Sequence, residues 1–494
     1  MKSFLPYPPV SIKMTRPPCT VRAAFRAQQG IHWRKHRRGI HMTDSAVQET
    51  PTLAPPMISG AKPDTGHFEE FCLNPAPFLM RCHEECGEVS SFDLAGLKTT
   101  LLVGEEAHEA VYRAPDSQLS AAQAYQLMVP VFGQGIQYGA PPAIERQQLK
   151  IQAAGLRHDR MVLYAPIIAK EVREWIADWP DQGEDDFYER FTDLTLKTST
   201  HCLMGADFRA TMGDEFRGLY HDLEMSVDPA GLADPHKHGA MAERRDIARA
   251  RLSELIGERV TKRKEALARG EEFHDMFQHY LDATYADGTA LTDHEIAGMV
   301  VWFMFAGHHT SGNTSSWVLV ELARHPELMA EIVAELDDLL GDSDDVTFQA
   351  LREMPKMDAF LDEVLRLHAP LVTLTRRVMH DFHYKDYLIE AGGNVMVSPY
   401  VAHRLPELYE DPLVFNPKRT FPDGAFAYLP FGGGRHKCVG NAFALLQVKT
   451  IFAYLLRKFE FELSQPAEYY RDIMPSLILR PSDPCRLRFR RRVR

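Results

Sequence analysis

The segment from Phe431 to Gly440 constrains the fold of this chain more than any other, because it places one cysteine behind a glycine-rich turn. Cys438 follows three consecutive glycines and precedes an apolar stretch, beginning near Ala442, that has the pattern of a helix. Glycines let the backbone approach a sulfur closely, and the positive end of a helix dipole favours negative charge nearby. Both effects lower the pKa of a thiol, and the thiolate is the form that binds metal. The segment therefore predicts that Cys438 is a thiolate ligand, of the kind that binds heme iron.

The same segment resembles the heme-ligand motif of the cytochrome P-450 superfamily, Phe-x-x-Gly-x-(Arg/His)-x-Cys-x-Gly. Every fixed position is matched, by Phe431, Gly434, His436, Cys438 and Gly440. The alternative is a buried structural cysteine after a glycine turn. The resemblance implies that Cys438 is the metal ligand and that the cofactor is heme b (iron protoporphyrin IX). A thiolate ligand pushes electron density onto iron and favours O–O cleavage.

A second motif lies about seventy residues before the cysteine. Glu363 and Arg366 are three residues apart in a segment with helical pattern that Pro370 ends, so they share one face of the helix. By itself this pair is compatible with an ordinary surface ion pair. It resembles the Glu-x-x-Arg pair of cytochromes P-450, and Arg419 resembles the residue that completes the buried structural triad of that family.

A long helix is predicted from Thr292, where Thr292 and Glu295 form a capping box, to Pro326. Its length of about thirty residues corresponds to roughly 45 Å. A membrane span needs about twenty predominantly apolar residues, and the polar patch at 308–313 interrupts the apolar run. We therefore expect a buried helix with polar groups at its middle, and no transmembrane anchor.

The middle of this helix resembles the oxygen-activation segment of cytochromes P-450. The resemblance implies that Thr310 is a catalytic hydroxyl group, and that His309 occupies the place of the acid that usually precedes it. Histidine can relay protons near neutral pH; the alternative is a histidine packed in the core. The His-Thr pair is characteristic of one branch of the superfamily, the sterol 14α-demethylases, and the resemblance to their bacterial members extends over about residues 60–494.

The resemblance also assigns cofactor and substrate contacts by position. Basic or hydroxyl groups suit the anionic heme propionates, and the residues so placed are Tyr125, Arg146, Arg376 and His436. An apolar substrate pocket, for which ordinary core packing is the alternative, would be lined by Met128, Phe132, Tyr138, Phe305, Ala306 and Leu371. Gly139 stands where the family has an acid, which we expect to loosen the loop over the substrate.

The bulk properties agree with one large domain. The chain has 494 residues, of which 45% are hydrophobic, enough for a sizeable core. Helical periodicity dominates, with short strand patterns near 87–103 and 374–400. We expect a mainly α fold with a small β-rich lobe, the cytochrome P-450 fold. Seven scattered cysteines do not suggest a disulfide framework, which favours a reducing cytosol.

The termini differ in charge from the body of the chain. Residues 1–42 contain nine Lys or Arg and no acid, whereas the whole chain carries a net charge of −12. We interpret 1–42 as a basic extension that is disordered or not native, 43–66 as a polar leader and 67–494 as a single cytochrome P-450 domain. The acidic body argues against nucleic acid as a partner. The arginine-rich stretch at 486–494 is expected to form a closing strand with a solvated face.

The resemblance implies a heme-thiolate monooxygenase that is soluble and cytoplasmic. Its reaction would be oxidative 14α-demethylation of a sterol, with O2 and with electrons that come ultimately from NAD(P)H. Because the length leaves no room for a flavin or iron–sulfur domain, a separate ferredoxin and ferredoxin reductase, or their equivalent, must deliver the electrons. Two alternatives remain open: a P-450 hydroxylase of another hydrophobic substrate (steroid, terpenoid or fatty acid), and a non-catalytic heme-thiolate binding or sensor protein.

Overall fold

The computed structural model describes residues 53–210, 213–227, 235–474 and 478–493. These residues belong to one compact unit, Pro51–Arg494. The basic extension at 1–42 and residues 43–52 of the polar leader lie outside the described residues. Isolated bridges tie the rest of the leader to strands, pairing Leu53 with Tyr387 and Met57 with Ser91. The boundaries of the extension, the leader and the domain stay predictions.

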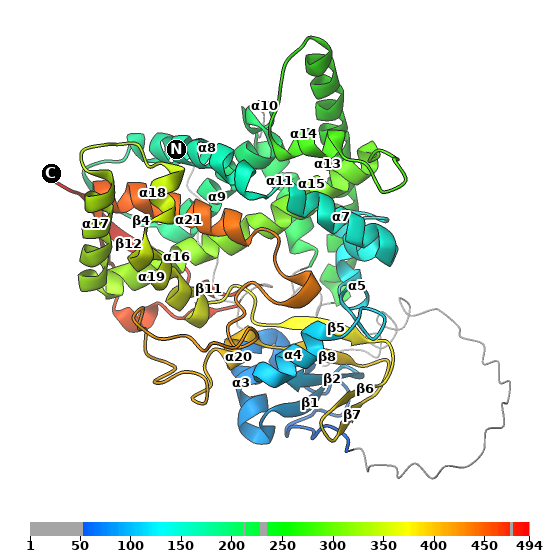
Figure 1. Cartoon of the computed structure of the whole chain (residues 1–494). Coiled ribbons are helices and arrows are strands. Elements are labelled where there is room, and N and C mark those ends of the chain that lie inside the picture. Colours follow the sequence, from blue (N-terminus) through cyan, green and yellow to red (C-terminus); the bar gives the residue numbers. More distant parts are fainter. Residues whose placement is uncertain (1–52, 211–212, 228–234, 475–477, 494) are drawn as a thin grey trace. The chain divides into compact units, whose positions relative to one another are not determined.

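Helices make up most of the described elements (Figure 1). The α-helices are α2 (Phe68–Leu73), α3 (Pro75–Cys86), α4 (Glu105–Arg113), α5 (Ala121–Ala124), α6 (Val129–Phe132), α7 (Pro142–Ala154), α8 (His158–Ala177), α9 (Phe187–Met204), α10 (Ala206–Ala210), α11 (Asp214–Met225), α13 (Pro235–Ala268), α14 (Met276–Asp282), α15 (Asp293–Gly307), α16 (His309–Arg324), α17 (Pro326–Leu340), α18 (Phe348–Arg352), α19 (Pro355–Leu367), α20 (Pro399–Ala402) and α21 (Asn441–Lys458). The 3₁₀ helices are η1 (Gln126–Met128), η2 (Gln137–Gly139), η3 (Gly434–His436) and η4 (Ala467–Tyr469).

The strands form small sheets, and the largest has five strands in the order β1-β2-β8-β5-β3. Within it β2 and β8 run parallel and the other neighbours antiparallel. Figure 1 shows this sheet and the β6–β7 hairpin gathered at the lower end of the drawing, with most helices above. The strands are β1 (Val89–Leu94), β2 (Leu97–Leu102), β3 (Leu119–Ser120), β4 (Gln182–Asp186), β5 (Leu374–Val378), β6 (Phe382–Tyr384), β7 (Tyr387–Ile389), β8 (Asn394–Val397), β9 (Phe459–Leu463), β10 (Asp472–Ile473), β11 (Arg480–Pro481) and β12 (Arg486–Arg491).

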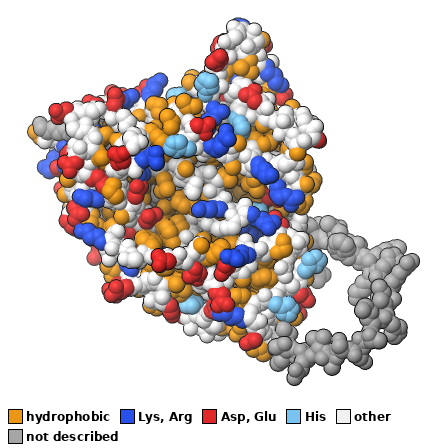
Figure 2. All heavy atoms as spheres, in the orientation of Figure 1, with side chains coloured by type: hydrophobic (Ala, Val, Ile, Leu, Met, Phe, Trp, Pro, Cys, Tyr) orange, Lys and Arg blue, Asp and Glu red, His pale blue; other side chains and the backbone are white. Residues whose placement is uncertain are grey.

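These elements confirm the predicted mainly α fold with a small β-rich lobe, and strands occupy both stretches where the sequence pattern placed them. The arginine-rich end also forms the predicted strand, since β12 pairs with β4 and β9. Its Leu487 and Phe489 are buried while the alternating arginines are exposed. Figure 2 shows hydrophobic side chains together across the middle of the face drawn, with charged groups of both signs around them.

The long helix begins as predicted but does not run straight through. Thr292 and Glu295 form the capping box at the start of α15. The helix is interrupted at His308, which has φ −83° and ψ −72°, and α16 continues from the next residue. Thr195 of α9 donates its hydroxyl hydrogen to the His308 carbonyl at 3.2 Å. The His308 carbonyl also keeps its helical hydrogen bond from the Gly312 N–H at 3.1 Å, so the Thr195 hydroxyl adds to that bond and does not replace it. Across the described helices, we find none with the length and apolar character that a membrane crossing requires.

A buried charge cluster anchors the chain that leads to the cysteine loop. Arg366 binds both carboxylate oxygens of Glu363 at 2.8 Å, and both side chains are fully buried. Arg366 also donates to the carbonyl oxygens of His403 and Pro412, each at 2.7 Å. Arg419 lies 3.3 Å from Glu363, so the structure brings the three residues of the expected triad together.

The segment 403–433 contains no helix or strand, so its backbone polar groups need other partners. The His403 side chain supplies one of them and also ties the segment to α19. Its Nδ1 donates to the Arg366 carbonyl at 3.2 Å, and its Nε2 accepts from the Leu429 N–H at 2.9 Å. Burial lowers the pKa of His403 to about 3, so the ring stays neutral and keeps one donor and one acceptor. The cysteine loop that follows is thereby positioned from α19.

Candidate functional site

The loop before Cys438 is shaped by its glycines. The Cys438 N–H donates to the Phe431 carbonyl at 2.9 Å, which closes the loop. Gly434 has φ +63°, a conformation that side chains disfavour. A Cβ atom there would lie only 2.5 Å from the carbonyl oxygen of Tyr112. The glycine of the motif is therefore required both by the backbone conformation and by the close approach of α4.

The electrostatics of Cys438 differ from the sequence prediction. Burial raises the pKa of its thiol, while the Gly440 N–H and the Lys437 charge lower it, and the net direction is upward. The prediction of a lowered pKa was wrong for the protein alone, because burial outweighs the favourable groups. Cys438 is nevertheless accessible at its surface. Metal coordination deprotonates a thiol outright. A bound metal cation can therefore stabilise the thiolate form that the groups of the loop do not stabilise enough on their own.

Buried donors near this loop fit an anionic cofactor. Arg376 is 6% exposed, and its guanidinium carbon lies 5.9 Å from the centre of the Tyr112 ring. The Tyr112 hydroxyl is buried and has no hydrogen-bond partner among the described residues. A Cβ at Gly432 would lie 3.9 Å from that hydroxyl, which places it beside the cysteine loop. A buried cation and an orphaned hydroxyl next to the thiol suit the propionates of a heme group.

The other residues expected to contact the propionates differ in their hydrogen-bond partners and in their exposure to solvent. The Tyr125 hydroxyl accepts from the Thr375 N–H at 3.1 Å, which places it beside Arg376. His436 binds Asp116 through Nε2 at 2.7 Å, and Arg146 lies exposed on α7. The structure therefore does not bring all four residues into one contact set.

Sequence reasoning missed Asp116. It lies 320 residues before His436, in a turn without a recognisable motif. Its charge also acts on Glu145 of α7, where burial is the first cause and Asp116 the second of a pKa raised to about 7. The environment of the expected propionate ligands therefore contains acidic groups as well as basic ones.

The centre of the long helix presents Thr310 as expected. Its Oγ1 donates to the Ala306 carbonyl at 2.8 Å, and Ala306 is exposed although it lies in the middle of the helix pair. Thr314, one turn further, donates to the Thr310 carbonyl at 2.8 Å. The Thr310 oxygen keeps its lone pairs for a further hydrogen bond.

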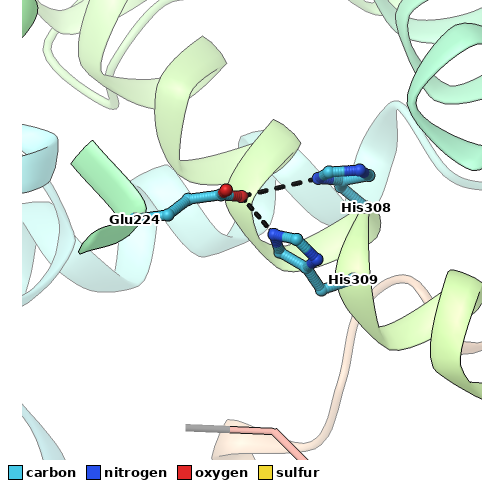
Figure 3. Close-up of side chains that lie close together, drawn as sticks. All are labelled: Glu224, His308 and His309. Carbon is cyan, nitrogen blue, oxygen red and sulfur yellow. Dashed lines mark hydrogen bonds and ion pairs between the residues drawn. The ribbon is translucent and has the colours of Figure 1, made fainter. Parts of the chain in front are cut away.

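An acid from another helix contacts the two histidines. Figure 3 shows Glu224 of α11 directed at His308 and His309, with Oε1 hydrogen-bonded to Nε2 of His309 and 3.5 Å from Nδ1 of His308. Burial alone would raise the pKa of Glu224, but the two histidines lower it to about 2. The acid that the helix segment itself lacks is thus supplied by α11. No local sequence signal indicates it, because it lies 85 residues before His309.

The expected pocket residues are partly brought together by aromatic contacts. Ring centres lie 5.2 Å apart for Tyr125 and Tyr138, 6.4 Å for Tyr138 and Phe132, and 5.7 Å for Phe132 and Phe305. This series continues to Tyr220 of α11 at 6.3 Å, a residue that sequence reasoning missed. Of the remaining expected residues, Met128 is buried in η1 whereas Leu371 is 41% exposed between α19 and β5.

The loop that carries Gly139 is closed by its own backbone. The Gly139 carbonyl accepts from the Gly135 N–H at 3.2 Å and from the Gln134 side chain at 3.1 Å. A Cβ at Gly139 would lie 3.0 Å from a methyl carbon of Val129. The loop conformation therefore suits glycine at this position, and these hydrogen bonds hold the loop together without the acid.

Comparison with known proteins places the chain in a family. The sequence model of the Cytochrome P450 family matches residues 59–489. The chain belongs to the cytochrome P450 family. Family membership implies a heme-thiolate cofactor, and the cysteine loop with its buried basic and hydroxyl groups fits that cofactor.

Relatives confirm the resemblance to sterol 14α-demethylases. The "Sterol 14alpha-demethylase" of Mycolicibacterium vanbaalenii is 41% identical, with coverage of 91% of this P450 chain and 100% of the relative. The protein of the same name from Mycobacterium tuberculosis is 39% identical, with 89% and 99% coverage. The "Lanosterol 14-alpha demethylase" of Bos taurus is 33% identical, with 89% and 90% coverage.

A solved structure confirms the cytochrome P-450 fold. The chain matches a retinoic acid-bound cyanobacterial CYP120A1 with a TM-score of 0.78 and 23% identity. The match covers 89% of this chain and all of the other.

Replacing Gly434 with alanine tests the architecture of the cysteine loop. The added methyl group would meet the Tyr112 carbonyl at 2.5 Å, so the loop must shift. We expect Gly434→Ala to lower the free energy of unfolding by about 1–3 kcal/mol more than the control substitution. We also expect loss of the thiolate-type spectrum of the reduced carbon monoxide complex. The control is Gly392→Ala, where φ is +89° but no atom lies within 4 Å of the added carbon. Equal losses in stability and identical spectra would contradict this account.

Proposed function

We propose that this P450 monooxygenase removes the 14α-methyl group of a sterol by successive oxidations that release the carbon as formate. The observation that carries the proposal is the set of relatives from mycobacteria to cattle. They are matched over 89–91% of this chain, and all carry the name of a sterol or lanosterol 14-demethylase. The histidine pair before Thr310, in place of an acid, supports the same assignment.

In the proposed enzyme, heme b bound to Cys438 supplies the oxygen chemistry, as the cofactor does throughout this family. Arg376, Tyr125, Arg146 and His436 would contact the heme propionates, Arg376 and Tyr125 from neighbouring positions and Arg146 from the exposed side of α7. Asp116 acts through His436, because its carboxylate fixes the orientation of that imidazole at 2.7 Å. The Gly440 N–H and the Lys437 charge favour the thiolate over the thiol.

Protons reach the reaction centre from the polar middle of the long helix. His309 and Glu224 share a hydrogen bond between Nε2 and Oε1, and His309 is 22% exposed by its side chain. A proton can therefore pass between solvent and this pair. Thr310, the next residue, offers a hydroxyl oxygen that accepts a hydrogen bond while its hydrogen is held by the Ala306 carbonyl.

The aromatic series from Tyr125 to Phe305 forms one wall of the proposed substrate pocket, with Met128, Ala306 and Leu371 completing it. Flat aromatic surfaces bury large areas of a rigid apolar molecule, which suits a sterol ring system. The glycine at 139 favours a second candidate, a P450 hydroxylase of another hydrophobic substrate, since the family acid is replaced there.

Cytochromes P450 need a redox partner. For this chain we propose a separate ferredoxin with its reductase, fed by NAD(P)H, since the cytochrome P450 family model alone accounts for residues 59–489. A cytoplasmic location stays a prediction.

Titration of the ferric protein with sterols tests the proposed substrate. Lanosterol, 24-methylenedihydrolanosterol and obtusifoliol should each give a saturable shift of the Soret band from low-spin to high-spin iron, because a sterol in the pocket displaces iron-bound water. Smaller steroids and fatty acids serve as controls and should shift the band weakly. Absence of a shift with all three sterols, together with a shift by the smaller ligands, would favour the second candidate.

Substitution of Thr310 by valine tests the proton route, because valine keeps the shape and removes the hydroxyl group. We expect product formed per electron consumed to fall by about tenfold or more, within the range that one proton-transferring group contributes. The matched control is Thr314→Val, one turn along the same helix, because the Thr314 hydroxyl makes the same kind of bond to a backbone carbonyl as Thr310 but belongs to a buried residue. Full product yield from Thr310→Val, with electron consumption unchanged, would remove Thr310 from the route.

A further inference from the structure

We propose that Glu224, His308 and His309 form a binding site for a divalent transition metal ion of the zinc class, separate from the heme site. One carboxylate oxygen and one ring nitrogen of each histidine lie within 4.8 Å of one another (Figure 3). Two imidazoles and one carboxylate are a ligand set that Zn²⁺ adopts in proteins, usually with water in the fourth position. The set joins α11 to the junction of α15 and α16.

The hydrogen bonds of His308 leave a nitrogen directed at the carboxylate. Its Nε2 lies 3.1 Å from the Thr192 carbonyl oxygen, which can only accept, so Nε2 carries the hydrogen. In the neutral ring Nδ1 is therefore an acceptor, whereas in the protonated ring it donates toward Glu224 and lowers the pKa of that carboxyl group. Nδ1 is buried, makes no hydrogen bond with any described residue, and faces the Glu224 oxygen at 3.5 Å. Two acceptors that face each other in a buried place need a cation between them, which is either a proton or a metal ion.

The separation of these two atoms fits a metal ion. Ligand atoms that each lie about 2.0–2.1 Å from zinc in a tetrahedral site are roughly 3.4 Å from one another. The observed separation between His308 Nδ1 and Glu224 Oε1 is 3.5 Å. The His308 contact with Thr192 is also the outer contact that metal-bound histidines make, since they commonly donate their other ring N–H to a backbone carbonyl.

His309 completes the set from the adjacent position. Its ring centre lies 4.1 Å from that of His308, and its Nε2 already contacts the same carboxylate oxygen. Because that contact is a direct hydrogen bond, metal binding must displace its proton and let the ring move outward. The side chain of His309 is 22% exposed, which leaves room for that movement and for a water ligand. Tyr220, whose buried hydroxyl has no partner among the described residues, lies beside His308 with ring centres 5.7 Å apart.

A bound metal ion would hold α11 against the long helix immediately before Thr310. It would also occupy His309 Nε2, the atom that exchanges a proton with Glu224 in the proposed function. Zinc should therefore inhibit turnover. Metal binding itself does not depend on which substrate the enzyme takes, so the binding test below is independent of the proposed function.

Equilibrium dialysis of the heme-loaded full chain against zinc chloride, with metal analysis of the protein, tests the site. We expect one Zn²⁺ per chain at micromolar free zinc, and affinity at least about tenfold weaker in both Glu224→Gln and His308→Phe. The matched control is Glu171→Gln, because Glu171 is also buried but its partners are one histidine, His201 at 2.8 Å, and Arg209 at 3.1 Å. That variant should keep the wild-type affinity. No zinc on the wild-type chain, or equal affinity in wild type and Glu224→Gln, would show that a proton alone occupies the cluster.

If a substitution prevents folding, X-ray absorption at the zinc edge of the wild-type chain identifies the zinc ligands without any variant. We expect only nitrogen and oxygen ligands at about 2.0–2.2 Å, with the scattering pattern of two imidazoles. A sulfur neighbour at about 2.3 Å would place the zinc on a cysteine and overturn the proposal.

Discussion

The rest of the site depends on the hydrogen bonds that the buried guanidinium of Arg366 makes. It neutralises Glu363 and at the same time binds the carbonyl oxygens of His403 and Pro412, in a stretch of chain without helix or strand. Surface ion pairs contribute about 0–1 kcal/mol. Removing one partner of a buried pair costs about 3–5 kcal/mol, because a charge is left unpaired. The Arg366 guanidinium thus holds the irregular segment before the cysteine loop in place, and its removal would strongly destabilise the fold.

After the segment held by Arg366, the chain enters the cysteine loop, where burial and nearby polar groups shift the pKa of Cys438 in opposite directions. Burial raises the pKa of the Cys438 thiol, and the Gly440 N–H and Lys437 only partly offset it. Across the site, burial would also raise the pKa of Glu224, but two histidines overcome it. The two groups are thus shifted in opposite directions, because Glu224 has two histidine partners and Cys438 has only a backbone N–H and one lysine charge.

Features encoded within a few residues could be predicted from the sequence. The cysteine loop, the capping box at Thr292 and the spacing of Glu363 and Arg366 each follow from local chemistry. Contacts between distant segments could not: Glu224 and Asp116 carry no motif, and they meet His309 and His436 only after folding. The break at His308 lies in a stretch where the sequence pattern predicts one continuous helix. The pKa of Cys438 was misjudged because helix dipoles and glycines are visible in a sequence, whereas the extent of burial is not.

Release of formate from a labelled sterol tests the central claim most directly. The enzyme, reconstituted with a ferredoxin and its reductase, would receive a sterol that carries an isotopic label in the 14α-methyl group. The account predicts labelled formate in an amount equal to the demethylated sterol formed, with both dependent on O2 and electrons. Hydroxylation elsewhere on the sterol, with the label retained and no formate released, would contradict it.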